Sequence, residues 1–300
     1  MNTTAKISVA AMAFLTITGT SIASAQNLYV ADWYYSGAIY DVSPGGSVST
    51  FYSGGLGEPE GIAFDSSGNL FVGDSYDGYI DEITPGGTES IFASGLIDPD
   101  GLAFNSSGDL FVSDYTAGNV YEYTPGGART TIASGLSNPN GLAFNSAGDL
   151  FVAAYGSGTI LEYTPGGSVS TFASGINHPF GLAFSSAGNL FVSYDGTTPA
   201  DYTGGVTEIM PGGVQTSIAT GLFNPNELAF NSSGNLFVAN AHTGDVLEIT
   251  PSGSVSTFAT GLGNATGLAF QGEALPVPEP SAIALIVVGC SAVLMRARKR

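Results

Sequence analysis

The sequence is dominated by one repeated unit. A motif of glycine, an aliphatic residue, alanine and phenylalanine begins at Gly61, Gly101, Gly141, Gly181 and Gly267, and a sixth copy has Glu227 in the glycine position. A second motif, leucine–aromatic–valine, begins at Leu28, Leu70, Leu110, Leu150, Leu190 and Leu236. The first four copies of the glycine motif are evenly spaced. Their period, about 40 residues with several short apolar runs, predicts a closed or stacked repeat array.

Each repeat contains four runs of strand type separated by strong turn signals. In the second copy the predicted strands are 102–104, 110–113, 120–123 and 130–133. The turn 105–109 (Asn-Ser-Ser-Gly-Asp) joins the first two, with a glycine that can take positive φ. A Pro-Gly-Gly turn at 125–127 joins the last two. Four antiparallel strands in one repeat make one blade of a β-propeller.

The ends of the repeat array are out of phase. The array begins with a second strand at 28–30 and ends with a first strand at 268–270. Together these fragments complete one blade, which closes the ring and removes the open edge. We therefore predict an all-β, six-bladed β-propeller of four-stranded antiparallel blades with the termini sharing one blade. A WD40 propeller and a β-helix fit less well, because the Trp-Asp signature is missing and the period is too long for a β-helix coil.

The net charge of the propeller limits the kinds of molecule that it can bind. Between residues 26 and 280 the chain has one positive side chain, Arg129, against 25 negative ones, a net charge of −24. Such a body repels phosphate backbones, which excludes nucleic acid as a partner and favours solubility and cation binding. The single cysteine, Cys290, lies outside the repeats, so disulfides do not stabilise the ring.

Residues 1–25 have the pattern of a secretory signal peptide, which would form a helix outside the propeller. Lys6 precedes an apolar stretch at 7–17, and the small residues 23–25 form a cleavage site between Ala25 and Gln26. We therefore expect an exported protein that is processed by a signal peptidase. The alternative, an N-terminal strand, breaks the register of the repeat.

The composition changes again at residue 276. Pro278, Glu279 and Pro280 precede an apolar run at 281–295 and a basic cluster at 296–300. This order resembles the PEP-CTERM sorting signal of bacteria that make extracellular polysaccharide. The resemblance implies a transient helical anchor in the inner membrane, cleavage by an exosortase, and delivery to the cell surface or extracellular matrix. The alternative is a plain membrane anchor, although the apolar run is short for a membrane span.

The repeat itself resembles NHL-type propellers and the broader gluconolactonase-like group. The shared pattern is Pro-x-Gly-aliphatic-Ala-Phe followed by Gly-x-Leu-Phe-Val-x-Asp, and it covers roughly positions 28–272. Three segments follow: a signal peptide at 1–25, a propeller at 26–275 and a sorting tail at 276–300. The resemblance implies the fold, whereas such scaffolds carry many activities.

Antiparallel strand order places the start of each first strand and the end of each second strand on one face. Innermost strands line the central channel, so the residues before each glycine motif are expected to ring its mouth: Glu60, Asp100, Asn140, Phe180, Asn226 and Thr266. Carboxylate and amide oxygens suit Ca²⁺ or another divalent cation. The gluconolactonase-like resemblance implies Glu60, Asp100, Asn140 and Asn226 as metal ligands, with Asp100 as the base that activates water on a lactone. Phe180 departs from that pattern. The alternative is a ring of polar turn residues.

Aromatic side chains gather on the same predicted face. The predicted ligand-binding residues are Trp33, Tyr35, Tyr76, Tyr115, Tyr155, His178, Phe180 and His242. An insertion within 193–206 joins this face, either as part of the site or as a neutral loop extension. The two histidines can act as acid or base, or be incidental. The aspartates that end the second strands, such as Asp74 and Asp114, are expected to bind backbone amides.

Two functions follow from these features. The first is an exported, non-enzymatic binding or structural module at the cell surface or in the matrix, whose partner is an extracellular polysaccharide or another surface protein. Tyrosine and tryptophan faces would stack on sugar rings, and the acidic ring would accept hydroxyls or hold Ca²⁺. The near-identity of the copies favours this hypothesis. The second is a metal-dependent lactonase or related hydrolase with its site at the channel mouth.

Overall fold

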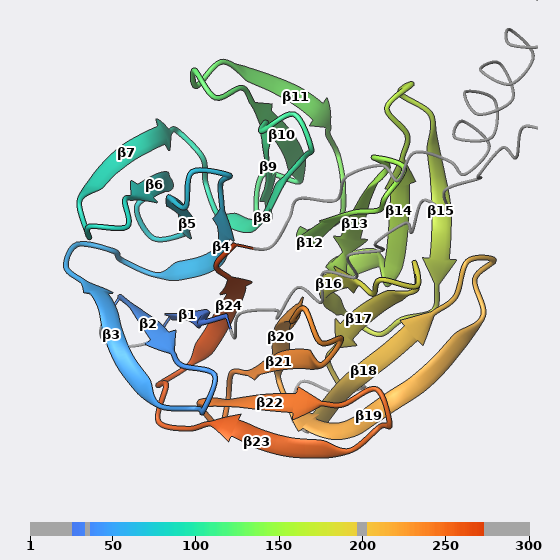
Figure 1. Cartoon of the computed structure of the whole chain (residues 1–300). Coiled ribbons are helices and arrows are strands. Elements are labelled where there is room, and N and C mark those ends of the chain that lie inside the picture. Colours follow the sequence, from blue (N-terminus) through green and yellow to red (C-terminus); the bar gives the residue numbers. More distant parts are fainter. Residues whose placement is uncertain (1–25, 34–36, 197–202, 273–300) are drawn as a thin grey trace, which may run out of the picture.

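The computed structural model describes residues 26–33, 37–196 and 203–272, and these form six four-stranded antiparallel sheets arranged around a central axis (Figure 1). The predicted six-bladed propeller is therefore confirmed. The signal peptide, the sorting tail, Tyr35 and most of the insertion lie outside the described residues. Within the described part, no helix is long and apolar enough to cross a membrane.

Each blade runs from an innermost to an outermost strand, and one short 3-10 helix, η1 (Tyr155–Ser157), follows a second strand. The strands are β1 (Leu28–Asp32), β2 (Ala38–Val42), β3 (Val48–Ser53), β4 (Pro59–Phe64), β5 (Leu70–Asp74), β6 (Tyr79–Ile83), β7 (Glu89–Ser94), β8 (Pro99–Phe104), β9 (Leu110–Asp114), β10 (Asn119–Tyr123), β11 (Arg129–Ala133), β12 (Pro139–Phe144), β13 (Leu150–Ala154), β14 (Thr159–Tyr163), β15 (Val169–Ser174), β16 (Pro179–Phe184), β17 (Leu190–Tyr194), β18 (Thr203–Ile209), β19 (Gln215–Phe223), β20 (Pro225–Phe230), β21 (Leu236–Asn240), β22 (Asp245–Ile249), β23 (Val255–Ala259) and β24 (Ala265–Phe270).

The closing blade has the strand order β24-β1-β2-β3 and so combines the two ends of the array. Leu28 pairs with Phe270, and Tyr29 pairs with Ala269. Beyond these strands, Gln271 donates its backbone N–H to the carbonyl of Asn27 at 3.3 Å. The shared blade predicted from the phase of the repeats is therefore present, and it closes the ring.

The second strand of each blade supplies most of the core. In β5, β9, β13 and β21 every residue is buried, because both faces of these strands are covered by neighbouring sheets. Aromatic rings join the blades: Phe111 of β9 and Phe144 of β12 lie 5.0 Å apart, edge to face at 81°. The same contact recurs at other blade interfaces, for example between Phe71 and Phe104. Packing between blades thus stabilises the ring without disulfides.

The innermost strands approach each other so closely that they require glycine. A Cβ added to Gly61 would lie 2.0 Å from the carbonyl oxygen of Asp100, and one on Gly101 would lie 2.3 Å from that of Asn140. Across the five glycines of the repeat motif, the nearest backbone oxygen would be 2.0–2.7 Å away. The glycine of the repeat therefore allows the close approach at these five positions. The fifth blade has Glu227 instead, and its sheet still takes its place in the ring.

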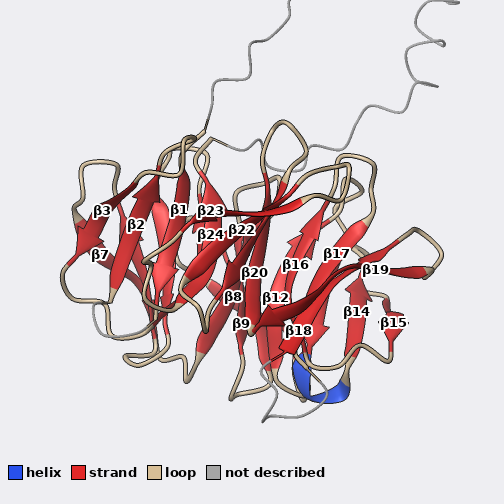
Figure 2. Ribbon diagram, turned by 90° about the horizontal axis from the view of Figure 1, so that it is seen from below, coloured by secondary structure: helices blue, strands red, loops and turns tan. Residues whose placement is uncertain are grey.

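The ring has two different faces, visible from the side in Figure 2. The hairpin face carries the turns between first and second strands, where Gly108 has φ 85° as predicted. In that turn Asn105 Oδ1 accepts the N–H groups of Ser107 and Asp109, both at 2.9 Å. The mouth face is the opposite one, where first strands begin and second strands end, and it carries η1.

Candidate functional site

Three carboxylates surround the channel on the mouth face. Glu60 lies on β4, Asp100 on β8 and Glu227 on β20, all near the starts of innermost strands. Each of the three residues keeps part of its surface exposed. The carboxylate of Glu227 lies beside the neighbouring blade, where its Oε2 would be 3.1 Å from a Cβ added to Gly181. The channel mouth therefore gathers acids from three blades.

Enclosure makes these carboxylates easier to protonate than free ones. Loss of bulk water and then the charge of Asp100 raise the pKa of Glu60 well above its usual value. Loss of water and then the charges of Asp98 and Glu227 raise the pKa of Asp100 in the same way. Burial raises the pKa of Glu227 to about 7, although a hydrogen bond from its neighbour's backbone opposes the shift. Enclosure therefore disfavours the charged form of all three acids.

The predicted ring divides into side chains that face this cluster and side chains that support the fold. Asn140 is buried and donates its amide Nδ2 to Asp100 Oδ2 at 2.6 Å. Thr266 is also buried and donates to the backbone carbonyl of Pro59 at 3.0 Å. The backbone carbonyl of Asn226 accepts the hydroxyl of Ser193 at 2.6 Å. The geometry thus brings together Glu60, Asp100 and Asn140, while Thr266 joins two blades.

The predicted metal ligands combine two carboxylates with two amides. Among the described residues, no three His, Cys, Asp or Glu side chains converge in a way that could hold an ion. One oxygen of Asp100 is already taken by the Asn140 amide. The predicted Ca²⁺ ligands Glu60, Asp100, Asn140 and Asn226 therefore stay a prediction for a metal measurement, and no chemical step is derived through a metal.

An aromatic cluster lies beside the acids on the mouth face. Tyr155, at the start of η1, stacks on His178 with ring centroids 4.5 Å apart at 21°. Phe180 meets Tyr155 edge to face at 5.0 Å, and Tyr115 does so at 5.8 Å. Burial, the Tyr155 hydroxyl and the charge of Asp100 together raise the pKa of Tyr115 to about 12. Phe180 also immediately precedes Gly181, where an added Cβ would lie 3.1 Å from Glu227 Oε2, so the aromatic cluster lies next to the carboxylate cluster.

His178 is held in an unusual backbone conformation. Its φ is 46°, whereas the equivalent residues before proline in two other blades are asparagines, Asn138 and Asn224, with φ of 52° and 55°. Asparagine tolerates this left-handed region better than most residues, so histidine here is the less favourable choice. The same conformation in three blades makes it a feature of the repeat, so the stacking of His178 on Tyr155, and not its backbone, distinguishes this cluster as a candidate site.

The structure shows other contacts for further residues of the predicted face. His242 stacks on Phe223 at 6.4 Å in the next blade, and no ring contact among the described residues joins it to His178. Tyr76 is 74% exposed and makes no ring contact within the described part of the chain. The backbone N–H of Trp33 donates to the carbonyl of Asn264 at 3.1 Å. Among the predicted face residues, four therefore form one cluster of touching rings: Tyr115, Tyr155, His178 and Phe180.

The aspartates at the ends of the second strands have the structural role expected of them. Asp114 is buried, and it accepts the backbone N–H groups of Ile97, Asp98 and Ala117 at 3.0–3.2 Å. Asp74 binds the N–H groups of Gly57 and Glu58 in the same way. These side chains fix the loops that precede the innermost strands, and so they position the residues of the channel mouth.

Glu227 was not among the residues predicted for the site. The sequence analysis assigned the ring to the residue before each motif, and Glu227 lies one position further along. A signal was present, because Glu227 is the one exception to the glycine of the motif. Only the close approach of the innermost strands shows why the other copies carry glycine there. A single departure from a residue pattern that the fold favours is a sign of function.

Comparison with known proteins supports the fold and leaves the activity open. No family model matches the sequence, and no curated protein matches it. Among solved structures, a chain of a nidogen/laminin complex is similar with a TM-score of 0.73 at 18% identity, covering 82% of this chain and 98% of that chain. A streptogramin B lyase has a TM-score of 0.62 at 13% identity, with 84% and 92% covered. A candidate gluconolactonase has a TM-score of 0.61 at 17% identity, with 72% and 86% covered.

These neighbours define the class of the protein. The chain is a six-bladed β-propeller whose structural neighbours include gluconolactonase-like folds. One neighbour comes from a complex between two proteins and another is an enzyme, so both a binding module and a catalyst are compatible with the fold. At sequence identities this low, the likeness shows the fold alone.

Proposed function

We propose that the protein is an exported binding module whose mouth face takes a neutral extracellular polysaccharide. The observation that carries this proposal is the aromatic cluster around Tyr155 beside the carboxylates of Asp100, Glu60 and Glu227. The C–H faces of a sugar ring pack on aromatic rings, and its hydroxyls donate to carboxylate and amide oxygens. The net charge of −24 between residues 26 and 280 repels acidic polymers, which favours a neutral one.

The test is binding of a neutral glucan, measured by isothermal titration calorimetry. We expect Tyr155→Ala to weaken binding at least tenfold, because it removes the ring that contacts the three others. Tyr76→Ala is the matched control, since this tyrosine shares the mouth face without joining the cluster. Equal affinity of the Tyr155→Ala protein and the wild type would reject the proposal.

A second candidate function is hydrolysis of a lactone, as the neighbour described as a candidate gluconolactonase suggests. The observation that favours it is the hydrogen bond of 2.6 Å from the Asn140 amide to Asp100 Oδ2, because it orients a carboxylate that burial and neighbouring acids make a stronger base. In a hydrolase, Asp100 would take the proton of a water molecule and Asn140 would hold the carboxylate in place. This candidate predicts lactone turnover by the wild type that is lost in Asp100→Asn. Measuring the turnover with and without Ca²⁺ tests the predicted cation in the same experiment.

The terminal segments give the proposed location. We propose that a signal peptidase cuts between Ala25 and Gln26, and that an exosortase-type enzyme cuts near Pro278, Glu279 and Pro280. The protein would then reach the cell surface or the extracellular matrix after a transient stay in the inner membrane. Mass spectrometry of the exported protein decides this, because a mature chain that retains residues beyond 280 would be anchored instead.

A further inference from the structure

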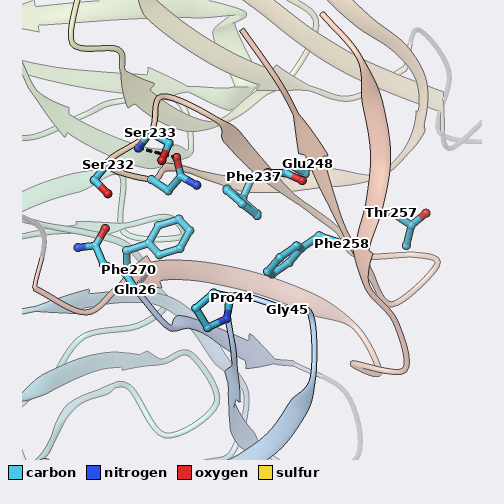
Figure 3. A pocket seen from close by; sticks show the side chains of 11 residues that line it. Gln26, Pro44, Gly45, Ser232, Ser233, Phe237, Glu248, Thr257, Phe258 and Phe270 are labelled. Carbon is cyan, nitrogen blue, oxygen red and sulfur yellow. Dashed lines mark hydrogen bonds between the residues drawn. The ribbon is translucent and has the colours of Figure 1, made fainter. Parts of the chain in front are cut away.

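A cavity of about 420 Å³ lies on the hairpin face, between the fifth blade and the closing blade (Figure 3). Its floor contains three phenylalanine rings, Phe237 and Phe258 from the fifth blade and Phe270 from the closing blade. Phe237 meets Phe258 at 4.8 Å and Phe270 at 5.1 Å, both edge to face. This volume is within the range of small-molecule sites in proteins.

Polar groups surround this aromatic floor. Ser232 and Ser233 lie on the turn before β21, and Thr257 lies on β23 across the cavity. Glu248 also lines the cavity, where its Oε1 accepts the amide of Asn235 at 2.6 Å. The lining thus combines apolar ring surface with hydroxyl, carboxylate and amide groups. Among the described residues, no lysine, arginine or histidine lines the cavity, so its wall carries no positive side chain.

The cavity lies where the hairpin face departs from the repeat. In the five other blades a covalent turn joins the first and second strands, but in the closing blade two separate chain segments meet there. Gln26 donates its Nε2 to the carbonyl of Gln271 at 3.2 Å. Its Oε1 is a buried acceptor without a hydrogen-bond partner among the described residues. Since buried acceptors are normally satisfied, the wall that Gln26 forms is incomplete by itself.

We infer that this cavity binds a single neutral sugar ring. A pyranose has apolar C–H faces for Phe258, the ring of the three that keeps part of its surface exposed, and hydroxyl donors for Glu248, the serines and Thr257. Glu248 disfavours anionic ligands, and an apolar ligand would leave the polar wall unpaired. The site is on the opposite face from the channel mouth, so it is independent of the proposed function. A protein with both sites can link two segments of a matrix polymer.

Gly45 allows a direct test, because it lines the cavity and an added Cβ there would meet no atom within 4 Å. We expect Gly45→Trp to fill the cavity while leaving the fold intact. Gly86→Trp is the matched control: Gly86 is the equivalent glycine of another blade, it does not line the cavity, and its nearest neighbour would be 3.9 Å away.

The experiment is saturation-transfer NMR of the full chain with glucose and with N-acetylglucosamine, followed by titration. The inference predicts at least a tenfold loss of affinity in Gly45→Trp and an unchanged affinity in Gly86→Trp. Absence of binding by the wild type at about 10 mM sugar would overturn it. The inference would also be overturned if Tyr155→Ala lost sugar binding while Gly45→Trp kept it. That result would support a site at the channel mouth alone.

Discussion

The two faces of this propeller are built from the same repeat but differ in how far the copies diverge. On the hairpin face, the turns of four blades share one plan, in which the first side chain caps the turn: Asp65, Asn105, Asn145 and Asn231 each accept two backbone N–H groups. On the mouth face, the equivalent ring positions carry Glu, Asp, Asn, Phe and Thr. The comparison teaches that repeated side chains hold the ring together, whereas the side chains of the mouth face vary from blade to blade, which is why we propose the binding site there.

The largest effect is expected from a substitution of the glycine that five copies of the repeat share. Gly101→Ala places a Cβ 2.3 Å from the carbonyl oxygen of Asn140, a backbone atom that cannot move without shifting a blade. We expect a loss of about 3 kcal/mol in the free energy of unfolding, measured by denaturant titration. Gly86→Ala, in open space, should cost less than about 0.5 kcal/mol. Equal costs would contradict the close-approach explanation.

The second prediction compares two aspartates of one blade, Asp100 on β8 and Asp114 on β9. Asp114→Ala removes the acceptor of three backbone N–H groups and should cost about 2 kcal/mol in unfolding free energy. Asp100→Asn removes a charge that its surroundings do not neutralise, and we expect it to be neutral or stabilising. If Asp100→Asn were the more damaging change, the carboxylates of the mouth would be structural.

The third prediction concerns Asp81, a buried acid at an apolar position of β6. The equivalent residues of two other blades, each opposite the valine of its second strand, are Leu161 and Leu247. Burial and then the charge of Glu89 raise the pKa of Asp81 to about 7, with smaller contributions from Asp74 and Asp77. The phenol of Tyr52 faces the same group from the closing blade.

Since the folded pKa of Asp81 is raised, the native state is favoured in acid and loses stability as pH rises toward 7. We expect Asp81→Leu to stabilise the protein by about 1–2 kcal/mol at pH 8 and to lose this advantage near pH 4. Melting temperatures across this range provide the measurement. A constant difference at every pH would show that packing rather than charge is responsible.

The smallest effect is expected when the glycine of the repeat motif is restored at position 227 on the mouth face. Glu227→Gly removes a partly exposed acid whose folded pKa of about 7 lies above the usual value for glutamate. Because stability from a raised pKa is present in acid and lost as pH rises, the variant should gain about 1 kcal/mol at pH 8 and nothing near pH 4. We also expect it to bind the glucan more weakly. A variant that is less stable at pH 8 would contradict this explanation.

The features that the sequence predicts correctly depend on residues that are close together in the chain. Strands, turns and the shared closing blade follow from motifs that are read within one or two repeats, and the structure confirms them. The cluster at the mouth depends on how neighbouring blades approach one another. Tyr115 and Tyr155 occupy equivalent places in the sequence, yet only Tyr155 stacks on a histidine, His178, which the loop of the next blade holds at positive φ. Glu227 likewise becomes a site residue only through the adjoining blades.

The most direct test of the proposed mouth site is a titration of the Glu227 carboxyl carbon by NMR, with and without the neutral glucan. We predict a midpoint of about 7 in the free protein, because burial disfavours the charged carboxylate, and a clear shift of that midpoint when the glucan binds. A midpoint near the ordinary glutamate value of about 4.3, unchanged by the glucan, would contradict both the enclosed acid cluster and its role in binding.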